Sequence, residues 1–509
     1  MAISVMRALD KAALQLYHYV AIVIAGMGLF TDAYSLFSIV PVTYLIGRIY
    51  YNPQDGKPGT VPTALRAAVV ASALVGTVVG QLLFGFLGDR IGRKKVYGVT
   101  LLIIVLSSFN CGFSIGRTAN YVISSLCFFR FFLGVGIGGD YPLSAVIMSE
   151  FANTERRGAL VAGVFSMQGF GILVSALVAM VVCRIFEVAQ PSGENAVLPH
   201  PPPSADLAWR IILMIGTIPA IFTFYSRMAM PETPRYTALA QGDMERAMVE
   251  ARMVLDIDID ELTNVTTPGR SIPSDEYGIF SKRFLKRHGA NLAACSISWF
   301  LLDVVFYSTT LFQSWIYKSA LKPPEHVTAF TEAFNLAKFQ AIFAVTAIIP
   351  GYSAAIMTID HLGRRVIQMM SFLIMAIVLL CMVLSYNTMV QDNYIHFNYL
   401  FMYAMVFFFA NCGPNTTTFV LPAELFPARF RTTCHGIAGA AGKIGAIIGS
   451  IGLFWCSETG YDDRHNRVPG SCMKYILIGL SAVCFVGVVH TYYFTPGWTI
   501  GMPLEERED

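Results

Sequence analysis

Residues Arg130–Gly171 read RFFLGVGIGGDYPLSAVIMSEFANTERRGALVAGVFSMQGFG, and this stretch decides the fold class. It holds two apolar segments joined by a short charged turn, and an apolar segment of about 20 residues is long enough to cross a bilayer. Four polar residues interrupt the apolar sequence: Arg130, Asp140, Tyr141 and Gln168. A charge at membrane depth costs at least about 2.5 kcal/mol on insertion scales, so such residues are functional candidates. The alternative is an internal ion pair that only fixes helix packing.

The composition is that of a protein with many membrane spans. Of the 509 residues, 55% are hydrophobic and 14% are charged, whereas soluble domains are about 25% charged. The mean hydropathy is +0.56. These values exclude a soluble enzyme, and a net charge of +3 without a basic tract argues against a nucleic-acid partner. The composition implies the lipid bilayer as a partner and no enzymatic activity.

The ten cysteines stand singly, with no CxxC pair and no cluster with histidine. We therefore expect neither a metal site nor a cofactor. Cys456 and Cys472 differ from the others because they bracket a polar loop, which makes their disulfide pairing a prediction. The first twelve residues lack the apolar core and cleavage site of a signal peptide. The first span should therefore stay in the mature protein.

The remaining apolar segments are as long as those in the opening stretch. Runs of this length indicate helices rather than barrel strands, whose segments are about 10 residues long and alternate. We therefore expect an all-α membrane protein with twelve transmembrane helices, near residues 18–47, 62–88, 96–115, 119–148, 158–185, 208–228, 290–317, 333–357, 365–385, 394–423, 434–455 and 473–494.

An internal repeat divides these spans into two sets of six. The pattern D-x-x-G-R begins at Asp89 and again at Asp360, a shift of 360 − 89 = 271. Asp32, inside the first span, recurs as Asp303 at the same shift, 303 − 32 = 271. Paired halves of this kind are typical of secondary transporters, whose substrate site lies near the membrane midplane between the halves. We expect an N-terminal half at 1–228, a cytosolic central loop at 229–289 and a C-terminal half at 290–509.

Basic residues set the expected orientation. Cytosolic loops carry an excess of lysine and arginine, and such residues gather in the turns on one side of the predicted membrane: Arg90, Arg93, Lys94, Lys95, Arg156, Arg157, Arg364, Arg365, Arg429 and Arg431. Both termini and the 229–289 loop fall on that side. We interpret the loop as a tether with a short surface helix near 242–255.

The motif GGDYPLSAVIMSEFAN at residues 138–153, followed by RRG and MQGFG, closely resembles the signature of the plant and fungal proton-coupled phosphate symporters. The likeness covers nearly the whole chain and is closest to the plant inorganic phosphate transporters. PETPRY at residues 231–236 is similar to the PESPR motif found after span 6 in many transporters of the major facilitator superfamily. The resemblance implies the major facilitator fold, with two six-helix halves related by pseudo-two-fold symmetry, in the plasma membrane.

Span 7 carries the clearest polar stripe. Trp299, Asp303 and Tyr307 stand four residues apart and therefore share one helix face. Such a face suits a polar cavity, and the alternative is an aromatic packing stripe with one interfacial acid. Span 10 adds Asn415 after Gly413-Pro414, where a broken helix can line a cavity.

Span 11 places Lys443 beside a stripe of glycines that favours close helix packing. A lysine this deep needs a partner, and an anion is the partner we expect. The alternative is snorkelling of the side chain to one surface.

Together these groups predict a small oxyanion substrate, because one positive charge is accompanied by several neutral donors. The predicted substrate-binding residues are Tyr141, Gln168, Trp299, Asp303, Tyr307, Asn415 and Lys443. Two acids beside an anion repel it when ionised but donate hydrogen bonds when protonated. Proton uptake and anion binding should therefore favour each other. The predicted proton-coupling residues are Asp32, Asp303, Asp140 and Arg130, and the resemblance implies this use of the matching residues.

Charged residues near the cytosolic helix ends predict a gate. We expect ion pairs that lock this side and break when it opens, among Asp89, Arg93, Glu150, Arg157, Asp360, Arg364, Glu424 and Arg431. The alternative is that the basic residues only set the topology.

One position departs from the resembled family. Close relatives usually read FTDAYDLF, whereas this chain reads FTDAYSLF at residues 30–37, so Ser35 replaces an acid. That change removes a titratable group and leaves Asp140 or Asp32 to serve as the counter-charge of Arg130.

The sequence therefore predicts a symporter that imports inorganic phosphate with protons by alternating access. The alternatives are a transporter of another small solute and a phosphate-binding membrane sensor with weak transport. Self-association into homo-oligomers stays open.

Overall fold

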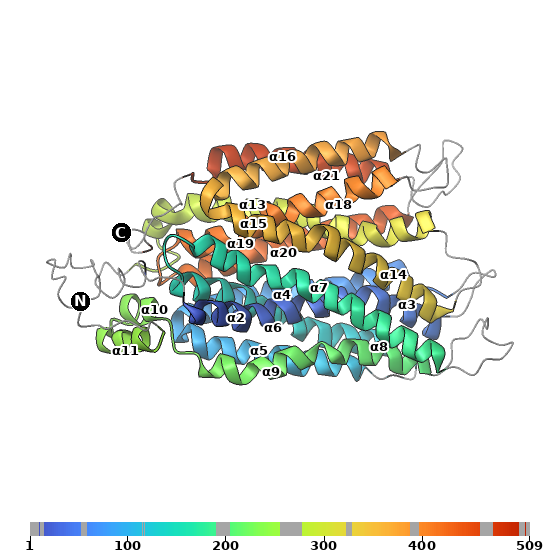
Figure 1. Ribbon diagram of the computed structural model, residues 1–509, viewed down its shortest axis with the longest axis horizontal. Helices are drawn as coiled ribbons and strands as arrows, with labels where there is room; N and C mark the ends of the chain where they lie inside the picture. The colour runs from blue at the N-terminus through green and yellow to red at the C-terminus, as the bar shows by residue number, and fades with distance from the viewer. Residues whose placement is uncertain are drawn as a thin grey trace.

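The computed structural model describes residues 10, 15–51, 59–114, 116, 118–189, 204–254, 277–321, 328–386, 397–458, 472–497 and 504. In this part of the chain the long helices run side by side along the long axis of the molecule (Figure 1). Eleven helical segments among the described residues are long and apolar enough to cross a membrane. The broken helix formed by α18 (Phe397–Cys412) and α19 (Pro414–Leu425) is the tenth span in chain order and brings the number of described spans to twelve. The predicted all-α architecture with twelve spans is confirmed.

The bounds of the other helices follow the predicted spans. The N-terminal set comprises α2 (Leu16–Phe37), α3 (Ile39–Tyr50), α4 (Thr63–Ile91), α5 (Arg93–Gly112), α6 (Ala119–Phe151), α7 (Arg157–Val188), α8 (Ser204–Ile215) and α9 (Thr217–Ala229). The C-terminal set comprises α13 (Lys282–Leu321), α14 (Ala329–Phe343), a π-helical turn (Ala344–Ile348), α15 (Ile349–Leu362), α16 (Arg364–Leu384), α20 (Arg431–Glu458) and α21 (Met473–Phe494). The helix of span 7 begins earlier than predicted, at Lys282 rather than near residue 290.

Four of the spans are interrupted, and each interruption lies just before or beside a proline. Proline removes one helical hydrogen bond, and its ring clashes with the carbonyl four residues earlier. Pro41 follows the break between α2 and α3, and Pro219 follows the break between α8 and α9. Pro350 follows the π-helical turn before α15, and Pro414 begins α19.

The two sets of helices meet along two seams. In one seam α4 packs against α20, and in the other α7 packs against α14 and α15. Gly436 allows the first close approach, because a Cβ atom there would lie 2.2 Å from the carbonyl oxygen of Gln81. Gly445 does the same for α20 on α13, with Phe300 O at 2.4 Å. The predicted glycine stripe therefore packs closely, except at Gly452, where an added Cβ atom would meet nothing within 4 Å among the described residues.

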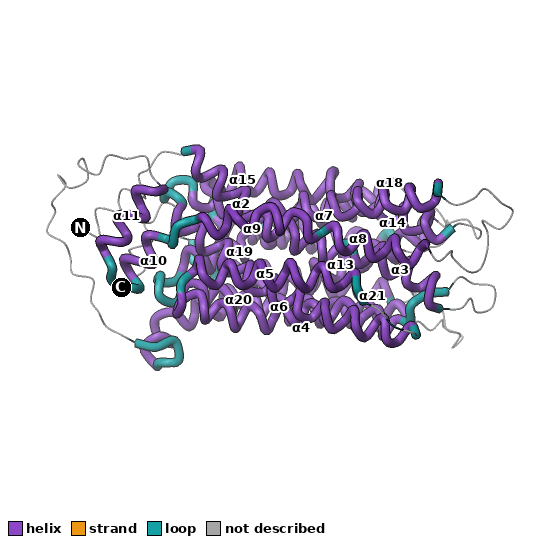
Figure 2. Tube along the Cα trace, turned by 90° about the horizontal axis from the view of Figure 1, so that it is seen from below, coloured by secondary structure: helices purple, strands orange, loops and turns teal. Residues whose placement is uncertain are grey.

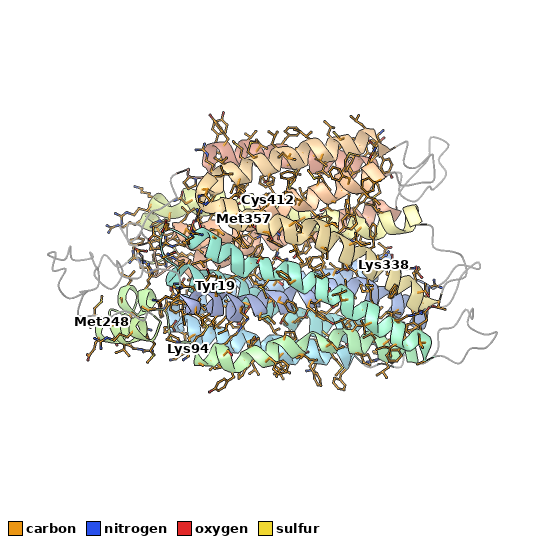
Figure 3. All side chains as sticks on the ribbon, viewed as in Figure 1. Tyr19, Lys94, Met248, Lys338, Met357 and Cys412 are labelled. Carbon is orange, nitrogen blue, oxygen red and sulfur yellow. The ribbon has the colours of Figure 1, made fainter. Side chains whose placement is uncertain are left out.

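The two ends of the bundle differ. Two short helices, α10 (Pro234–Leu239) and α11 (Met244–Val254), lie beyond one end (Figures 1 and 2). We call this end the linker end, and the opposite end, where α3 finishes and α8 begins, the far end. Lys94 lies at the linker end, and Lys338 of α14 lies toward the far end (Figure 3). The predicted short helix near 242–255 is confirmed by α11.

The outward faces of the bundle are apolar. Large hydrophobic side chains such as Leu106, Phe222 and Ile448 are more than half exposed, at 54%, 78% and 52%. Contiguous apolar surface of this kind marks contact with a membrane or a protein. The polar side chains considered below are buried between the helices instead.

Candidate functional site

A buried lysine lies at the interface between the halves. Lys443 is 3% exposed, and its Nζ donates to Asp303 Oδ2 at 2.8 Å and to Tyr307 Oη at 3.3 Å. The same Nζ lies 5.3 Å from the centre of the Tyr141 ring, which belongs to the other half. Asp303 and Tyr307 reach it together because they share one face of α13. Lys443 therefore does not snorkel to a surface.

A second polar group joins the halves through a tyrosine. Tyr352 of α15 donates to Gln168 Oε1 of α7 at 3.2 Å. Asn415 Nδ2 of α19 donates to Tyr352 Oη at 3.0 Å and to Asn411 Oδ1 at 2.8 Å. Tyr352 thus connects two predicted substrate residues that lie in different halves.

Aromatic rings link these two groups into one cluster. Phe165 and Phe419 stack with their centroids 4.3 Å apart, one ring from each half. Tyr141 meets both rings edge-on, at 6.3 and 6.2 Å. Trp299 meets Phe419 edge-on at 6.4 Å. All seven predicted substrate residues therefore lie in one contiguous cluster.

The stacked pair lies between this cluster and the linker end. Helix α7 runs from its start at the linker end through Phe165 to Gln168, and α19 runs from Asn415 through Phe419 toward Glu424. The two rings therefore form an apolar barrier on the linker side of the polar cluster.

The acids of the N-terminal half form a separate buried group. Arg227 of α9 holds Asp140 through two contacts, Nη1 to Oδ1 at 2.5 Å and Nη2 to Oδ2 at 3.3 Å. The guanidinium also lies 4.0 Å from the centre of the Tyr97 ring. Gly28 leaves room for this pair, since a Cβ atom there would lie 1.8 Å from Asp140 Oδ2.

Asp32 lies close to this pair but is not bonded to it. The residue is 0% exposed, and neither carboxylate oxygen has a hydrogen-bond partner among the described residues. Asp140 and Arg227 are the charged groups that act on it most strongly. Such a buried carboxyl is a candidate proton-binding group, because only its protonated form is neutral.

Arg130 does not have the counter-charge that the sequence suggested. Its Nε donates to the carbonyl of Val69 at 2.9 Å, and its Nη1 donates to the carbonyl of Ser35 at 3.2 Å. Among the described residues it forms no ion pair, although it is 1% exposed. The expectation that Asp140 or Asp32 serves Arg130 was wrong, because Asp140 is taken by Arg227 and Asp32 pairs with neither arginine.

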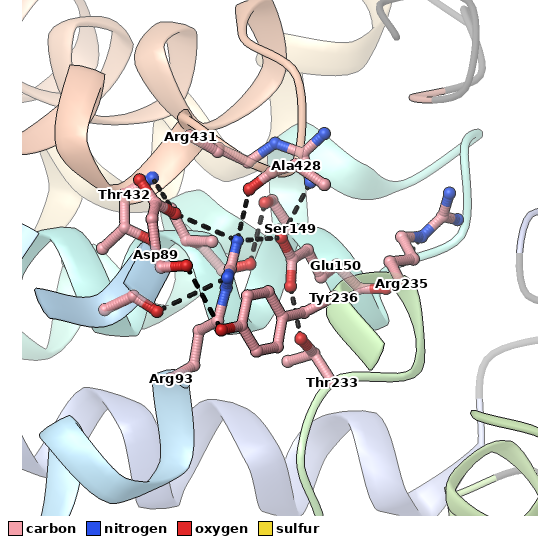
Figure 4. A network of polar contacts seen from close by, with 12 residues as sticks. Asp89, Arg93, Ser149, Glu150, Thr233, Arg235, Tyr236, Ala428, Arg431 and Thr432 are labelled. Carbon is pink, nitrogen blue, oxygen red and sulfur yellow. Dashed lines mark hydrogen bonds and ion pairs between the residues drawn. The ribbon is translucent and has the colours of Figure 1, made fainter. Parts of the chain in front are cut away.

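The linker end is closed by a network around Glu150 (Figure 4). Its Oε1 accepts from Arg431 Nη1 at 2.9 Å, across the halves, and from Arg93 Nη2 at 3.3 Å. Its Oε2 accepts from the Thr233 hydroxyl at 2.5 Å, and its carbonyl accepts from Arg235 Nε at 2.9 Å. Glu150, Arg93 and Arg431 have fully buried side chains.

Two aspartates cross between the halves in a symmetrical way. Asp89 of α4 accepts from the backbone N–H groups of Thr432 and Thr433 at 3.2 and 2.7 Å, at the start of α20. Asp360 of α15 accepts from Gly158 N and Ala159 N at 3.1 and 2.8 Å, at the start of α7. The first N–H groups of a helix lack internal partners and carry partial positive charge, so each aspartate caps a helix of the other half.

The remaining predicted gate residues lie in the same layer. Arg364 Nη2 and Nε bind Glu424 at 2.6 and 3.0 Å, which repeats the pairing of Arg93 with Glu150. Arg157 donates to Asp10 Oδ1 at 3.0 Å, and Arg235 donates to the same oxygen at 2.7 Å. All eight predicted gate residues are therefore at the linker end.

The PETPRY segment is part of this network rather than a loose tether. Both carboxylate oxygens of Glu232 accept from the Lys94 backbone N–H, at 3.3 and 3.2 Å. Burial raises the pKa of the Glu232 carboxyl. The tether interpretation was therefore wrong for the first residues of the central loop.

The chain resembles known transporters along its full length. Residues 20–508 match the model of the sugar (and other) transporter family. A probable inorganic phosphate transporter 1-10 of Oryza sativa subsp. japonica is 51% identical over 99% of this chain and 92% of that protein. Inorganic phosphate transporter 1-4 of Arabidopsis thaliana is 47% identical over 96% of this chain and 93% of that protein. The chain belongs to the plant inorganic phosphate transporter family.

The fold of this family member also matches solved structures. A proton:xylose symporter of the major facilitator superfamily, bound to 6-bromo-6-deoxy-D-glucose, superposes with a TM-score of 0.73. The match covers 97% of this chain and 98% of that chain at 19% identity, so it shows the fold alone. The predicted family and the major facilitator fold are both confirmed.

The sequence did not indicate several residues of the site. Arg227 stands near the end of a predicted span, where an arginine reads as a surface residue. Tyr352, Phe165 and Phe419 read as ordinary apolar content of their spans. A better signal for Tyr352 was its place two residues after Pro350, at the interrupted eighth span. The side chain of Cys456 lies outside the described residues, so its pairing with Cys472 stays a prediction.

Proposed function

We propose that this transporter imports inorganic phosphate together with protons across the plasma membrane by alternating access. The buried Lys443–Asp303 pair between the halves carries the proposal, because it places one positive and one titratable negative charge at a single point. The names of its relatives support phosphate as the substrate.

Phosphate competes with Asp303 for Lys443. A phosphate ion carries negative charge and several acceptor oxygens, and Lys443 provides three donors. Tyr141 and Tyr307 contribute hydroxyl donors next to it, while Trp299 N–H and the amides of Gln168 and Asn415 lie in the same cluster. Phosphate therefore replaces an internal counter-ion, and the lysine is never left alone in the protein interior.

The competition couples phosphate to protons. An ionised Asp303 repels the incoming anion, whereas a protonated Asp303 is neutral and donates a hydrogen bond. Each ligand therefore favours the binding of the other, as reciprocal linkage requires. Asp32 acts as the second proton acceptor, while Asp140 is held by Arg227.

Alternating access requires contacts between the halves at both ends. The linker end has the Glu150–Arg431 pair and the two aspartates, Asp89 and Asp360, each of which caps a helix of the other half. The far end has an ion pair between Arg48 of α3 and Glu332 of α14. Opening one set while the other stays closed exposes the Lys443 cluster to one side at a time.

The orientation follows from the basic residues at the linker end. We place the linker end, both termini and the central segment 229–289 in the cytosol, with halves at 1–228 and 290–509. The far end then faces the cell exterior, and its Arg48–Glu332 pair is the outer gate.

Uptake by reconstituted protein tests the proposal. Radiolabelled phosphate is measured in vesicles with an inward proton gradient, without a gradient and with a protonophore. We expect accumulation only with the gradient. Equal uptake in all three conditions would indicate uncoupled transport, and binding without uptake would indicate a sensor. Neither binding nor uptake of phosphate, with gradient-driven uptake of labelled xylose, would indicate another substrate.

A further inference from the structure

The far end contains a small cavity that is separate from the Lys443 cluster. Its volume is about 30 Å³, and its lining includes Thr43, Tyr44, Arg48, Thr60, Arg66 and Glu332. None of the residues that line the cavity belongs to the Lys443 cluster. Arg48 lies near the end of α3 and Glu332 near the start of α14, both at the far end of the bundle, so the cavity is not part of that cluster.

The charges that line the cavity are unbalanced. Arg48 is paired with Glu332, with its Nε 3.0 Å from the carboxylate oxygen. Arg66 forms no ion pair among the described residues; its Nη2 donates to the Thr63 hydroxyl at 3.1 Å. The Nε of Arg66 is buried and has no hydrogen-bond partner among the described residues. Among the described residues that line it, the cavity thus has one surplus positive charge and a guanidinium donor without a hydrogen-bond partner.

The cavity also lies where the halves meet. Arg48 and Arg66 belong to the N-terminal half, and Glu332 belongs to the C-terminal half. The Arg48 and Glu332 side chains are 21% and 11% exposed, so water and ions reach them more easily than the buried pairs of the linker end. A change in the partner of Arg48 therefore changes a contact that holds the far end closed.

We propose that this cavity is an outer docking site for phosphate and that the docked ion opens the outer gate by replacing Glu332 on Arg48. The proposal rests on the proposed function, since it concerns how the same ion reaches the Lys443 cluster. Guanidinium groups bind phosphate through paired hydrogen bonds, and a phosphate ion with two charges competes well with a single carboxylate.

The size of the cavity fits an exchange rather than simple addition. One water needs about 10–15 Å³ of cavity volume, so the closed cavity, at about 30 Å³, holds about two waters. A phosphate ion with four oxygens needs the space that the Glu332 carboxylate occupies. Docking therefore requires Glu332 to leave Arg48, which links binding to opening.

Transport kinetics give the first test. Arg66→Gln should raise the KM for phosphate about three- to tenfold and leave Vmax unchanged, because a charged cleft raises local ion concentration. Arg184→Gln is the matched control, since Arg184 is a 66% exposed arginine at the same end whose Nη1 binds Glu187. An unchanged KM in Arg66→Gln, or an equal change in Arg184→Gln, would overturn the proposal.

Equilibrium binding separates the cavity from the central cluster. The double variant Asp303→Asn/Lys443→Met removes both central charges, and phosphate binding is measured by calorimetry in phospholipid-free detergent. We expect a weaker residual site that disappears when Arg66→Gln is added. No residual site, or one that survives Arg66→Gln, overturns the cavity proposal.

Two further outcomes are informative. Wild-type binding by the double variant would refute the central site while leaving the Arg66 comparison valid. If added phosphatidylglycerol abolishes the residual binding, a lipid headgroup is the natural occupant of the cavity, and the docking proposal fails.

Discussion

Replacing Asp303 with asparagine should tighten phosphate binding at neutral pH while abolishing accumulation. In the structure the Asp303 carboxylate holds Lys443 at 2.8 Å, where phosphate has to bind. Asparagine keeps the shape and a hydrogen-bond donor but cannot ionise. The variant therefore removes the competitor and the coupling proton in one step.

The size of the effect follows from the cost of protonating the competitor. For an ordinary aspartate with a pKa of about 3.9, protonation at pH 7 costs about 1.36 × (7 − 3.9) ≈ 4 kcal/mol. This figure is an upper limit on the energy that phosphate binding to the wild-type protein has to supply, and binding to Asp303→Asn avoids that cost. Part of the gain is offset because the buried Lys443 loses its resting partner. We therefore expect phosphate to bind roughly 10- to 100-fold more tightly at pH 7, which is about 1.4–2.7 kcal/mol.

Calorimetric titration with phosphate across pH 5 to 8 checks this result. Wild-type affinity should rise as pH falls, because the site takes up a proton with the anion, and Asp303→Asn should lose that part of the dependence. Asp243→Asn is the control for the ionisation of phosphate itself, since Asp243 is exposed and, within the described part of the chain, its side chain accepts only from the Arg246 N–H at the start of α11. Weaker binding by Asp303→Asn with an unchanged pH slope would refute the competition between Asp303 and phosphate.

Three other predictions concern single positions. Lys443→Met should weaken phosphate binding by about 2–5 kcal/mol, and adding Asp303→Asn should restore thermal stability but not uptake, because it removes the unpaired buried acid. Ser35→Asp should give Arg130 a carboxylate partner and therefore raise the melting temperature relative to Ser35→Asn. Its phosphate uptake should also depend more steeply on pH. No difference between the two variants would place position 35 outside the proton path. Burial raises the pKa of the Glu232 carboxyl, so this group binds a proton more readily in the folded protein than in the unfolded chain. The folded protein should therefore lose stability as pH rises from about 4.3, the value in the unfolded chain, through that raised pKa. Melting curves of Glu232→Gln measured across this pH range should lack this loss.

Local spacing and the internal repeat were enough to find most of the site. The four-residue spacing of Trp299, Asp303 and Tyr307 fixed a shared helix face before any packing was known. The repeat of Asp89 at Asp360 pointed to matched gates, and the structure shows both aspartates capping a helix of the opposite half. These features depend on one helix or on symmetry, so a single sequence carries them.

Pairings between helices were harder to predict. Arg130 and Asp140 stand 10 residues apart on α6, roughly 15 Å along its axis, so spacing alone excludes a pair between them. That Asp140 instead meets Arg227 depends on how α6 packs against α9, and the sequence does not specify that packing. The same reasoning explains Tyr352, whose role depends on α15 meeting both α7 and α19.

The strengths of the two gates suggest the order of events in import. At the linker end, the Glu150–Arg431 pair is fully buried, so the end can open only if both charges gain water or new partners. Each aspartate cap adds about 0.5–2 kcal/mol, and both caps cross between the halves, so separating the halves at this end breaks both. The Arg48–Glu332 pair at the far end is partly exposed, and such a pair contributes about 1 kcal/mol or less once solvent screening is included. The far end therefore opens more readily, and the linker end opens only when the binding of phosphate and protons supplies the larger cost.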